Sequence, residues 1–265
     1  MAKIHIDVIA TQVPDAPKKK KKSTSDRLIF ILDQSTSMGR MQEEAIAGFN
    51  EYVAEQKKVK GKAKLTLVLF DSKYQVVHDQ VDINDVPLLT SSVYRPQGMT
   101  ALQDAIGRTI YTYKDTAKKG EKTFVTILTD GYENVSKEYE GEAGRNAVMK
   151  LIKEVQDELK WEVMFTGAGI QVTSFATGLG IKGSKIASFD LSGKGVYDAI
   201  STLNVSTSYS RGDAKTVNLM AARGIVADAN GDISLDAVYA ANAIAPINPD
   251  LKLDDKKVKT TKTTA

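Results

Sequence analysis

The sequence contains no cysteine and only two histidines, His5 and His78, which lie far apart in the chain. Without cysteine there are no disulfides and no thiolate metal sites, so a reducing compartment is expected. Apolar runs reach only about five residues, far short of the roughly 20 that span a bilayer. Charged side chains interrupt residues 1–10 and exclude the apolar core of a signal peptide. These absences predict a cytoplasmic protein with no membrane segment and no Ser-His-Asp catalytic arrangement.

Length and composition indicate a soluble globular protein, since the 265 residues are 42% hydrophobic and 26% charged. The net charge of +3 comes from the five consecutive lysines Lys18 to Lys22, because removing them from the 36 basic residues leaves fewer than the 33 acidic ones. The folded body is therefore not expected to bind polyanions. Nucleic acid stays open as a partner of the lysine run, but no aromatic residue interleaves with the lysines, so a solvated linker is favoured.

From Arg27 onward, apolar runs alternate with longer stretches of helical period, which is typical of βα units and a largely parallel sheet. The predicted strands are 28–32, 65–70, 74–78, 124–128, 161–165 and 185–189. The predicted helices are 41–58, 101–117, 144–159 and 196–203, with Thr100 as an N-cap of the second. The short Asp71-Ser72-Lys73 connection between the second and third strands predicts a hairpin and hence an antiparallel edge.

The chain divides into four predicted regions. An N-terminal segment with the basic linker covers 1–26, the α/β domain 27–210, a C-terminal extension 211–249 and a disordered tail 250–265. The tail is expected to be disordered because it has almost no apolar residues. In the extension, Asn230-Gly231 lies between two short apolar runs and predicts a β-hairpin.

Oxygen-bearing side chains follow the carboxyl ends of predicted strands at separate places in the chain. Asp33, Ser35 and Ser37 form a D-x-S-x-S triplet after the first strand, Thr100 precedes a helix, and Asp130 lies in a Thr-Asp-Gly turn. Ligands of open α/β sheets bind at this edge. Hard oxygen ligands suit Mg²⁺ or Mn²⁺ better than zinc or copper.

This set of residues resembles the metal ion-dependent adhesion site of the von Willebrand factor A family, including stand-alone prokaryotic or phage members, over roughly Asp26 to Ser210. The resemblance implies a Rossmann-like three-layer α/β/α sandwich, with a mostly parallel central sheet and one antiparallel edge strand. It further implies that Ser35, Ser37 and Thr100 contact Mg²⁺, or alternatively Mn²⁺ or Ca²⁺. Asp33 and Asp130 would act largely through water and by orienting the serine hydroxyls. Thr36 replaces the glycine often found between the two serines.

By the same resemblance, the protein is expected to be a metal-dependent protein-binding module and not an enzyme. It would capture an exposed Asp or Glu of a partner, as an adaptor to a MoxR-type AAA+ ATPase in a bacterial cell or phage-infected host. The alternative is a structural component of a phage or nucleic-acid-associated assembly.

Two other interpretations of the triplet are weaker. Asp33, Ser35 and Ser37 could merely cap the following helix. A haloacid dehalogenase-like phosphatase also begins with an apolar strand and a D-x-D-x-T motif, but Ser35 stands where its second acid belongs and cannot act as the general acid.

Three further motifs are interpreted as chance matches. Gly178-x-Gly180-x-x-Gly183 precedes a predicted strand, whereas a dinucleotide fingerprint follows one. The acidic run 228–232 imitates half of an EF-hand loop but has Ile233 at the glycine position. Arg211-Gly212-Asp213 spells an integrin-ligand tripeptide in a chain with no predicted secretion signal.

Overall fold

The computed structural model describes residues 25–118 and 120–244. Most of the predicted N-terminal segment, with the lysine run, and the whole predicted tail lie outside these residues. No helix in the described part combines the length and apolar character needed to cross a bilayer.

The described residues form one six-stranded sheet in the order β3-β2-β1-β4-β5-β6. The strands are β1 Asp26–Asp33, β2 Ala63–Phe70, β3 Tyr74–Asp82, β4 Thr123–Thr129, β5 Glu162–Ala168 and β6 Ile186–Phe189. All neighbouring strands are parallel except β2 and β3, which are antiparallel. The predicted antiparallel edge is therefore confirmed, and the turn at Asp71 that joins β2 to β3 is the predicted one.

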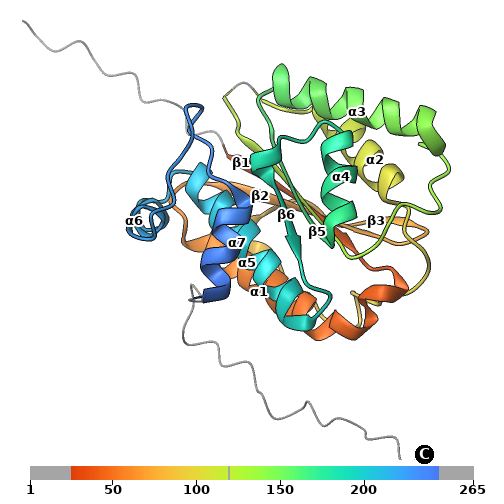
Figure 1. Ribbon diagram of the computed structural model, residues 1–265, viewed down its shortest axis with the longest axis horizontal. Coiled ribbons are helices and arrows are strands. Elements are labelled where there is room, and N and C mark those ends of the chain that lie inside the picture. Colours follow the sequence, from red (N-terminus) through yellow and green to blue (C-terminus); the bar gives the residue numbers. More distant parts are fainter. Residues whose placement is uncertain (1–24, 119, 245–265) are drawn as a thin grey trace, which may run out of the picture.

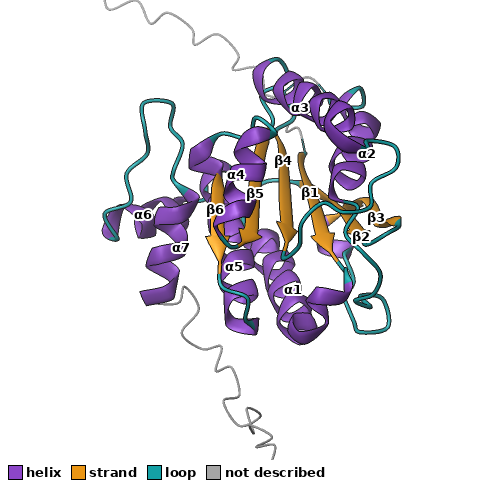
Figure 2. Ribbon diagram, turned by 45° about the vertical axis from the view of Figure 1, so that its right-hand side comes forward, coloured by secondary structure: helices purple, strands orange, loops and turns teal. Residues whose placement is uncertain are grey.

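Helices cover both faces of the sheet (Figures 1 and 2). The helices are α1 Gln42–Lys58, α2 Leu102–Lys114, α3 Gly141–Asp157, α4 Ile170–Gly178, α5 Gly193–Ser210, α6 Ala214–Ala222 and α7 Leu235–Ile244. Residues of α1, α5 and α7 pack in one hydrophobic cluster, and residues of α2, α3 and α4 pack in another. The predicted three-layer α/β/α sandwich is confirmed.

Strand β1 is buried on both faces, which explains why its sequence is continuously apolar. Leu28, Phe30 and Leu32 point to the cluster with α1 and α5, whereas Ile29 and Ile31 point to the cluster with α2 and α3. Successive side chains of a strand point to opposite faces. Both hydrophobic layers therefore hold β1, and with it Asp33 at its carboxyl end, in a fixed position.

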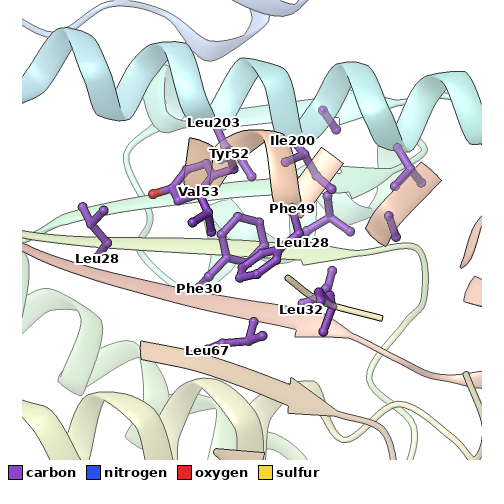
Figure 3. Packing of buried hydrophobic residues seen from close by; sticks show 14 of the residues in the cluster. Leu28, Phe30, Leu32, Phe49, Tyr52, Val53, Leu67, Leu128, Ile200 and Leu203 are labelled. Carbon is purple, nitrogen blue, oxygen red and sulfur yellow. The ribbon is translucent and has the colours of Figure 1, made fainter. Parts of the chain in front are cut away.

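The ring of Phe30 lies at the centre of the first cluster (Figure 3). Its centroid is 5.3 Å from that of Phe49 and 5.1 Å from that of Tyr52, both in edge-to-face geometry. Phe49 and Tyr52 lie on the buried face of α1. Such aromatic pairs contribute beyond their buried area and fix the position of a helix on the sheet.

The predicted C-terminal hairpin is wrong, because residues 225–234 form no strands and connect helix α6 to helix α7. The Asn230-Gly231 turn does exist, with Gly231 at φ 83°, and Asp228 N donates to Asp232 O at 2.9 Å. The flanking segments do not pair as strands. Ile233 instead packs with Met220 of α6 and Val238 of α7 in a small hydrophobic cluster that α5 also joins.

Helix α4 is a further element that the sequence pattern did not predict, since residues 166–184 contain three glycines of an apparent loop motif. Gly178 ends α4, and a Cβ placed on it would lie 1.9 Å from Nη2 of Arg145. Glycine at this position therefore leaves room for the Arg145 guanidinium. The interpretation that the Gly178 motif is no dinucleotide fingerprint agrees with this position at a helix end.

Candidate metal centre

The predicted site residues lie where the strand order of the sheet reverses. From β1 the chain crosses through α1 to β2 on one side, while β4 pairs with β1 on the other. The carboxyl ends of β1 and β4 therefore lie side by side (Figure 2). Asp33 ends β1 and Asp130 directly follows β4. Crevices at such reversals are the usual ligand sites of open α/β sheets.

Hydrogen bonds connect four of the five predicted residues. Asp33 Oδ1 accepts from Ser35 N at 2.6 Å, and the Ser35 and Ser37 hydroxyls are 3.1 Å apart. Ser37 Oγ donates to Asp130 Oδ1 at 2.6 Å. Residues separated by 93 positions, Ser37 and Asp130, are thus in direct contact. The D-x-S-x-S triplet and the Thr-Asp-Gly turn form one cluster of oxygen atoms.

Thr100 lies against the same turn. A Cβ on Gly131 would be only 2.9 Å from Thr100 Oγ1, so this hydroxyl is next to the residue that follows Asp130. Asn134 holds the backbone of Thr100 through two hydrogen bonds. Thr100 N donates to Asn134 Oδ1 at 2.9 Å, and Thr100 O accepts from Asn134 N at 3.1 Å. The predicted N-cap role of Thr100 is wrong, since Ala101 is the N-cap of α2 and no side chain caps it.

The interpretation of the triplet as a helix cap also fails. Ser35 is the N-cap of the short 3-10 helix Thr36–Met41, but its side chain makes no capping hydrogen bond. Met41 precedes α1 without a side-chain cap. The serine hydroxyls point instead toward each other and toward Asp130.

Both carboxyl groups are desolvated without a basic partner at salt-bridge distance in the described part of the chain. Asp33 is 0% exposed, and its burial raises its pKa to about 7. Burial also raises the pKa of Asp130, partly offset by the hydrogen bond from Ser37 and by the charge of Arg40. Asp130 Oδ2 is buried and has no hydrogen-bond partner. Buried carboxylate oxygens without partners are unfavourable unless a cation or proton compensates them.

Thr129 is a site residue that the sequence analysis did not assign. Its hydroxyl donates to Asp33 Oδ2 at 2.5 Å and also accepts from Gly131 N at 3.1 Å. It therefore orients the Asp33 carboxylate and the turn after β4 together. The sequence could have indicated Thr129, because it directly precedes Asp130 and the last residue of a buried strand lies at the same carboxyl edge of the sheet. Tyr94 OH, which donates to Asp33 O at 2.7 Å, carried no such signal.

The donor set fits a hard cation. No cluster of three or more His, Cys, Asp or Glu side chains occurs among the described residues, so the oxygen cluster combines two carboxylates with neutral hydroxyls. Ser35 and Thr100 are nearly buried, whereas Ser37 is exposed and gives access from solvent. Oxygen-only ligands and access to water are what Mg²⁺ requires.

The other acidic and basic motifs have structural roles. Arg211 of the Arg-Gly-Asp triplet is buried and bonds through Nε to Asp26 Oδ2 at 2.9 Å, and Asp213 caps α6 by accepting from Thr216 N at 2.9 Å. Asp228 Oδ1 accepts from the backbone N of Asn230 and Asp232 at 2.8 and 3.0 Å, which is a closed turn. Neither motif presents its charged groups as an integrin ligand or a calcium loop would.

The sequence model of the von Willebrand factor type A domain matches residues 28–188, which is more than half of the chain. No curated protein matches the chain. Solved structures with similar folds include two pilus proteins. The pilus adhesin SpaC from Lactobacillus rhamnosus GG, in its open conformation, has a TM-score of 0.55 at 13% identity, over 72% of this chain and 30% of that chain. A mutant of the PilB minor pilin from Streptococcus sanguinis has a TM-score of 0.51 at 10% identity, over 77% of this chain and 64% of that chain.

The chain thus spans less than two thirds of either structural relative, and likeness at such identity concerns the fold alone. The match to the family model extends from β1 to β6 and includes all five residues of the oxygen cluster. The chain belongs to the von Willebrand factor type A domain family.

Proposed function

We propose that this protein binds a partner protein through a divalent cation, most simply Mg²⁺, with Mn²⁺ or Ca²⁺ as alternatives. Domains of this family typically mediate metal-dependent protein interactions or adhesion. Ser35, Ser37 and Thr100 would hold the ion, with Asp33 and Asp130 behind them. When bound, the ion would supply an electrophilic position that accepts a carboxylate oxygen from the partner.

The observation that carries the proposal is the unpartnered, buried Oδ2 of Asp130. Its other oxygen accepts from Ser37, and Ser37 in turn contacts Ser35. A carboxylate buried for purely structural reasons would satisfy both oxygens with donors, as buried polar groups generally do. An incoming cation would satisfy this oxygen and compensate the charge of both Asp33 and Asp130.

The residues around the oxygen cluster support binding more than catalysis. Thr129 and Ser35 hold the Asp33 carboxylate, which is 0% exposed, so it is not available as the nucleophile that a phosphatase would need. In the proposed site, the residues around Asp33 orient hydroxyl oxygens toward the position of the ion. Because neutral hydroxyls would contact the ion directly and the two carboxylates would lie behind them, the ion would stay electrophilic, and the acidic side chain of a partner would complete its coordination.

The test compares Asp33→Ala and Asp130→Ala with the wild-type protein. Titration calorimetry should detect Mg²⁺ binding to the wild type and about ten- to a hundredfold weaker binding to either variant, because each removes a charged group of the site. Far-UV circular dichroism should stay unchanged. Asp115→Ala is the matched control, because Asp115 is an exposed carboxylate at the end of α2. Equal Mg²⁺ affinity in all four proteins would refute the proposal.

For the partner, we propose an adaptor role beside a MoxR-type AAA+ ATPase, with a phage or nucleic-acid-associated assembly as the alternative. Capture from the native host with and without chelator separates the two. A metal-dependent AAA+ partner supports the adaptor, whereas capsid, tail or replication proteins support the assembly. Replacing Lys18 to Lys22 by serine tests nucleic acid directly, since retained binding in that variant would exclude the lysine run as its site.

A further inference from the structure

A groove begins next to the candidate metal centre and runs between the loop 133–141 and helices α3 and α4. It consists of two hollows of about 440 and 500 Å³ that share Gln103 and Gly141. The lining of the first hollow includes Glu133 and Asn134, and that of the second includes Glu142, Arg145 and Phe175. Because the hollows share residues, they form one elongated surface feature.

The near end of the groove adjoins the oxygen cluster through Asn134. Asn134, which lines its near end, holds the backbone of Thr100 on both sides through contacts of 2.9 and 3.1 Å. Gln103 follows Thr100 by three residues and is the second residue of α2. A chain segment whose acidic side chain reaches Thr100 would therefore have this groove directly beside it.

Gln103 lies at the centre of the groove with an unsatisfied acceptor. It is only 4% exposed, and its Oε1 is buried without a hydrogen-bond partner in the described part of the chain. Its backbone N donates to Glu133 Oε2 at 2.7 Å, which fixes the residue at the start of α2. A buried amide oxygen without a donor is costly, and leucine of similar size would avoid that cost. The presence of an amide at position 103 is therefore better explained by a ligand that donates a hydrogen bond to its oxygen.

The far end of the groove carries a cation with no carboxylate partner. The Arg145 guanidinium lies over the Phe175 ring, 5.5 Å from its centroid, and the described residues place no carboxylate within salt-bridge distance of it. Gly178 leaves the space that this guanidinium fills. An arginine whose guanidinium is stacked on an aromatic ring is suited to binding a carboxylate.

We infer that this groove binds the extended segment of the partner that carries the metal-bound acidic residue. A backbone N–H of that segment donates to Gln103 Oε1, and a second acidic side chain pairs with Arg145. The inference rests on the proposed function, because the metal-bound residue sets the register of the segment. A peptide segment fits because it supplies backbone N–H donors together with carboxylate side chains along an elongated surface.

The test selects ligands from a displayed library of short random peptides, each with one fixed Glu, on the full-length protein in Mg²⁺. Synthetic copies of the selected peptides are then titrated against Gln103→Leu by fluorescence anisotropy. Their affinity should fall about tenfold, the usual effect of losing one hydrogen bond in a desolvated site. Mg²⁺ affinity should not change. The melting temperature should be unchanged or higher, since leucine removes an unpartnered polar atom.

Two further variants complete the design. Thr112→Ala is the control on the exposed face of α2, and it should bind every peptide as the wild type does. Arg145→Met should weaken only the peptides that contain a second acidic residue, and this effect should vanish at high salt.

The outcomes separate this inference from the proposed function. If peptides bind only with Mg²⁺ and only when Asp33 is intact, but bind Gln103→Leu as tightly as the wild type, the groove is not their site and the metal-dependent function stands. If Gln103→Leu lowers the melting temperature, Gln103 has a structural role and the inference is overturned. If no selected peptide requires Mg²⁺, both the function and the inference fail.

Discussion

At the scale of single residues, the candidate site depends on hydroxyl groups that orient carboxylates. The Thr129 hydroxyl donates to one oxygen of Asp33, whose other oxygen accepts from Ser35 N, and the Ser37 hydroxyl donates to one oxygen of Asp130. A lysine or arginine in place of either hydroxyl would neutralise the cluster and close it to an external cation. Among the described residues no such cation lies at salt-bridge distance, so the negative charge is left for a ligand to compensate, as the proposed function requires.

Thr129→Val tests this orienting role. The substitution keeps the shape of the side chain but removes the hydroxyl that contacts Asp33 Oδ2 at 2.5 Å. We expect Mg²⁺ affinity to fall by about ten- to a hundredfold, as is usual for groups that orient metal ligands, while the protein stays folded. Titration calorimetry measures the change.

The matched control is Thr126→Val in the same strand. The Thr126 hydroxyl is also buried but donates to Ile29 O at 3.2 Å, away from the oxygen cluster. It should lose some stability and no Mg²⁺ affinity. A similar loss of affinity in both variants would mean that β4 as a whole, and not the Thr129 hydroxyl, determines binding.

At the scale of elements, the sequence predicted the strands that are buried on both faces and also the more exposed edge strand β3. Runs such as Leu28 to Leu32 can only be strands of a covered sheet, and the oxygen residues directly after them could be assigned to its carboxyl edge. The resemblance to the von Willebrand factor A site, and not the strand pattern, predicted that Asp33 and Asp130 would be neighbours. The strand pattern could not predict Tyr94 or Asn134 at the site, because both come from loops whose position depends on tertiary contacts.

The C-terminal extension shows where local pattern fails. The Asn230-Gly231 signal correctly indicated a turn, but tertiary packing determined what lies on either side of it. Asp232 bonds to the buried Lys185 at 3.0 Å, and Lys185 also pairs with Glu162 at 3.0 Å. Burial lowers the pKa of Lys185, but these two carboxylates raise it by more. The ion pairs fix the turn against β5 and the start of β6, which leaves no partner strand for a hairpin.

Leu235→Ala tests whether the extension belongs to the core of the domain. Leu235 begins α7, is 0% exposed and packs in the same hydrophobic cluster as β1 and α1. We expect the free energy of unfolding to fall by about 2 to 5 kcal/mol, as for other buried leucines. Chemical denaturation measures it, and Leu88→Ala, at a 73% exposed leucine, should have almost no effect. A loss below about 1 kcal/mol at Leu235 would show that α7 is only loosely attached.

At the scale of the whole molecule, the oxygen cluster and the attachment of the extension lie at opposite ends of the sheet. Arg211 bonds to Asp26 at the beginning of β1, whereas Asp33 ends the same strand. Arg211 Nη1 also donates to Gln56 Oε1 at 2.9 Å, which ties the end of α5 to the end of α1. One buried strand therefore connects the two ends. A ligand at the oxygen cluster would therefore stabilise the domain at the carboxyl end of β1, while the extension stabilises it at the beginning of the same strand.

This arrangement predicts that Mg²⁺ raises the stability of the entire domain. A ligand that binds only the folded state adds about 2.7 kcal/mol at a concentration of 100 times its dissociation constant. The melting temperature should therefore rise in excess Mg²⁺ relative to chelator, in a single cooperative transition. Asp130→Ala should melt at the same temperature in both conditions. If the wild type also melts at the same temperature with and without Mg²⁺, Mn²⁺ or Ca²⁺, the oxygen cluster is not a metal site, because compensating two buried carboxylates must stabilise the fold.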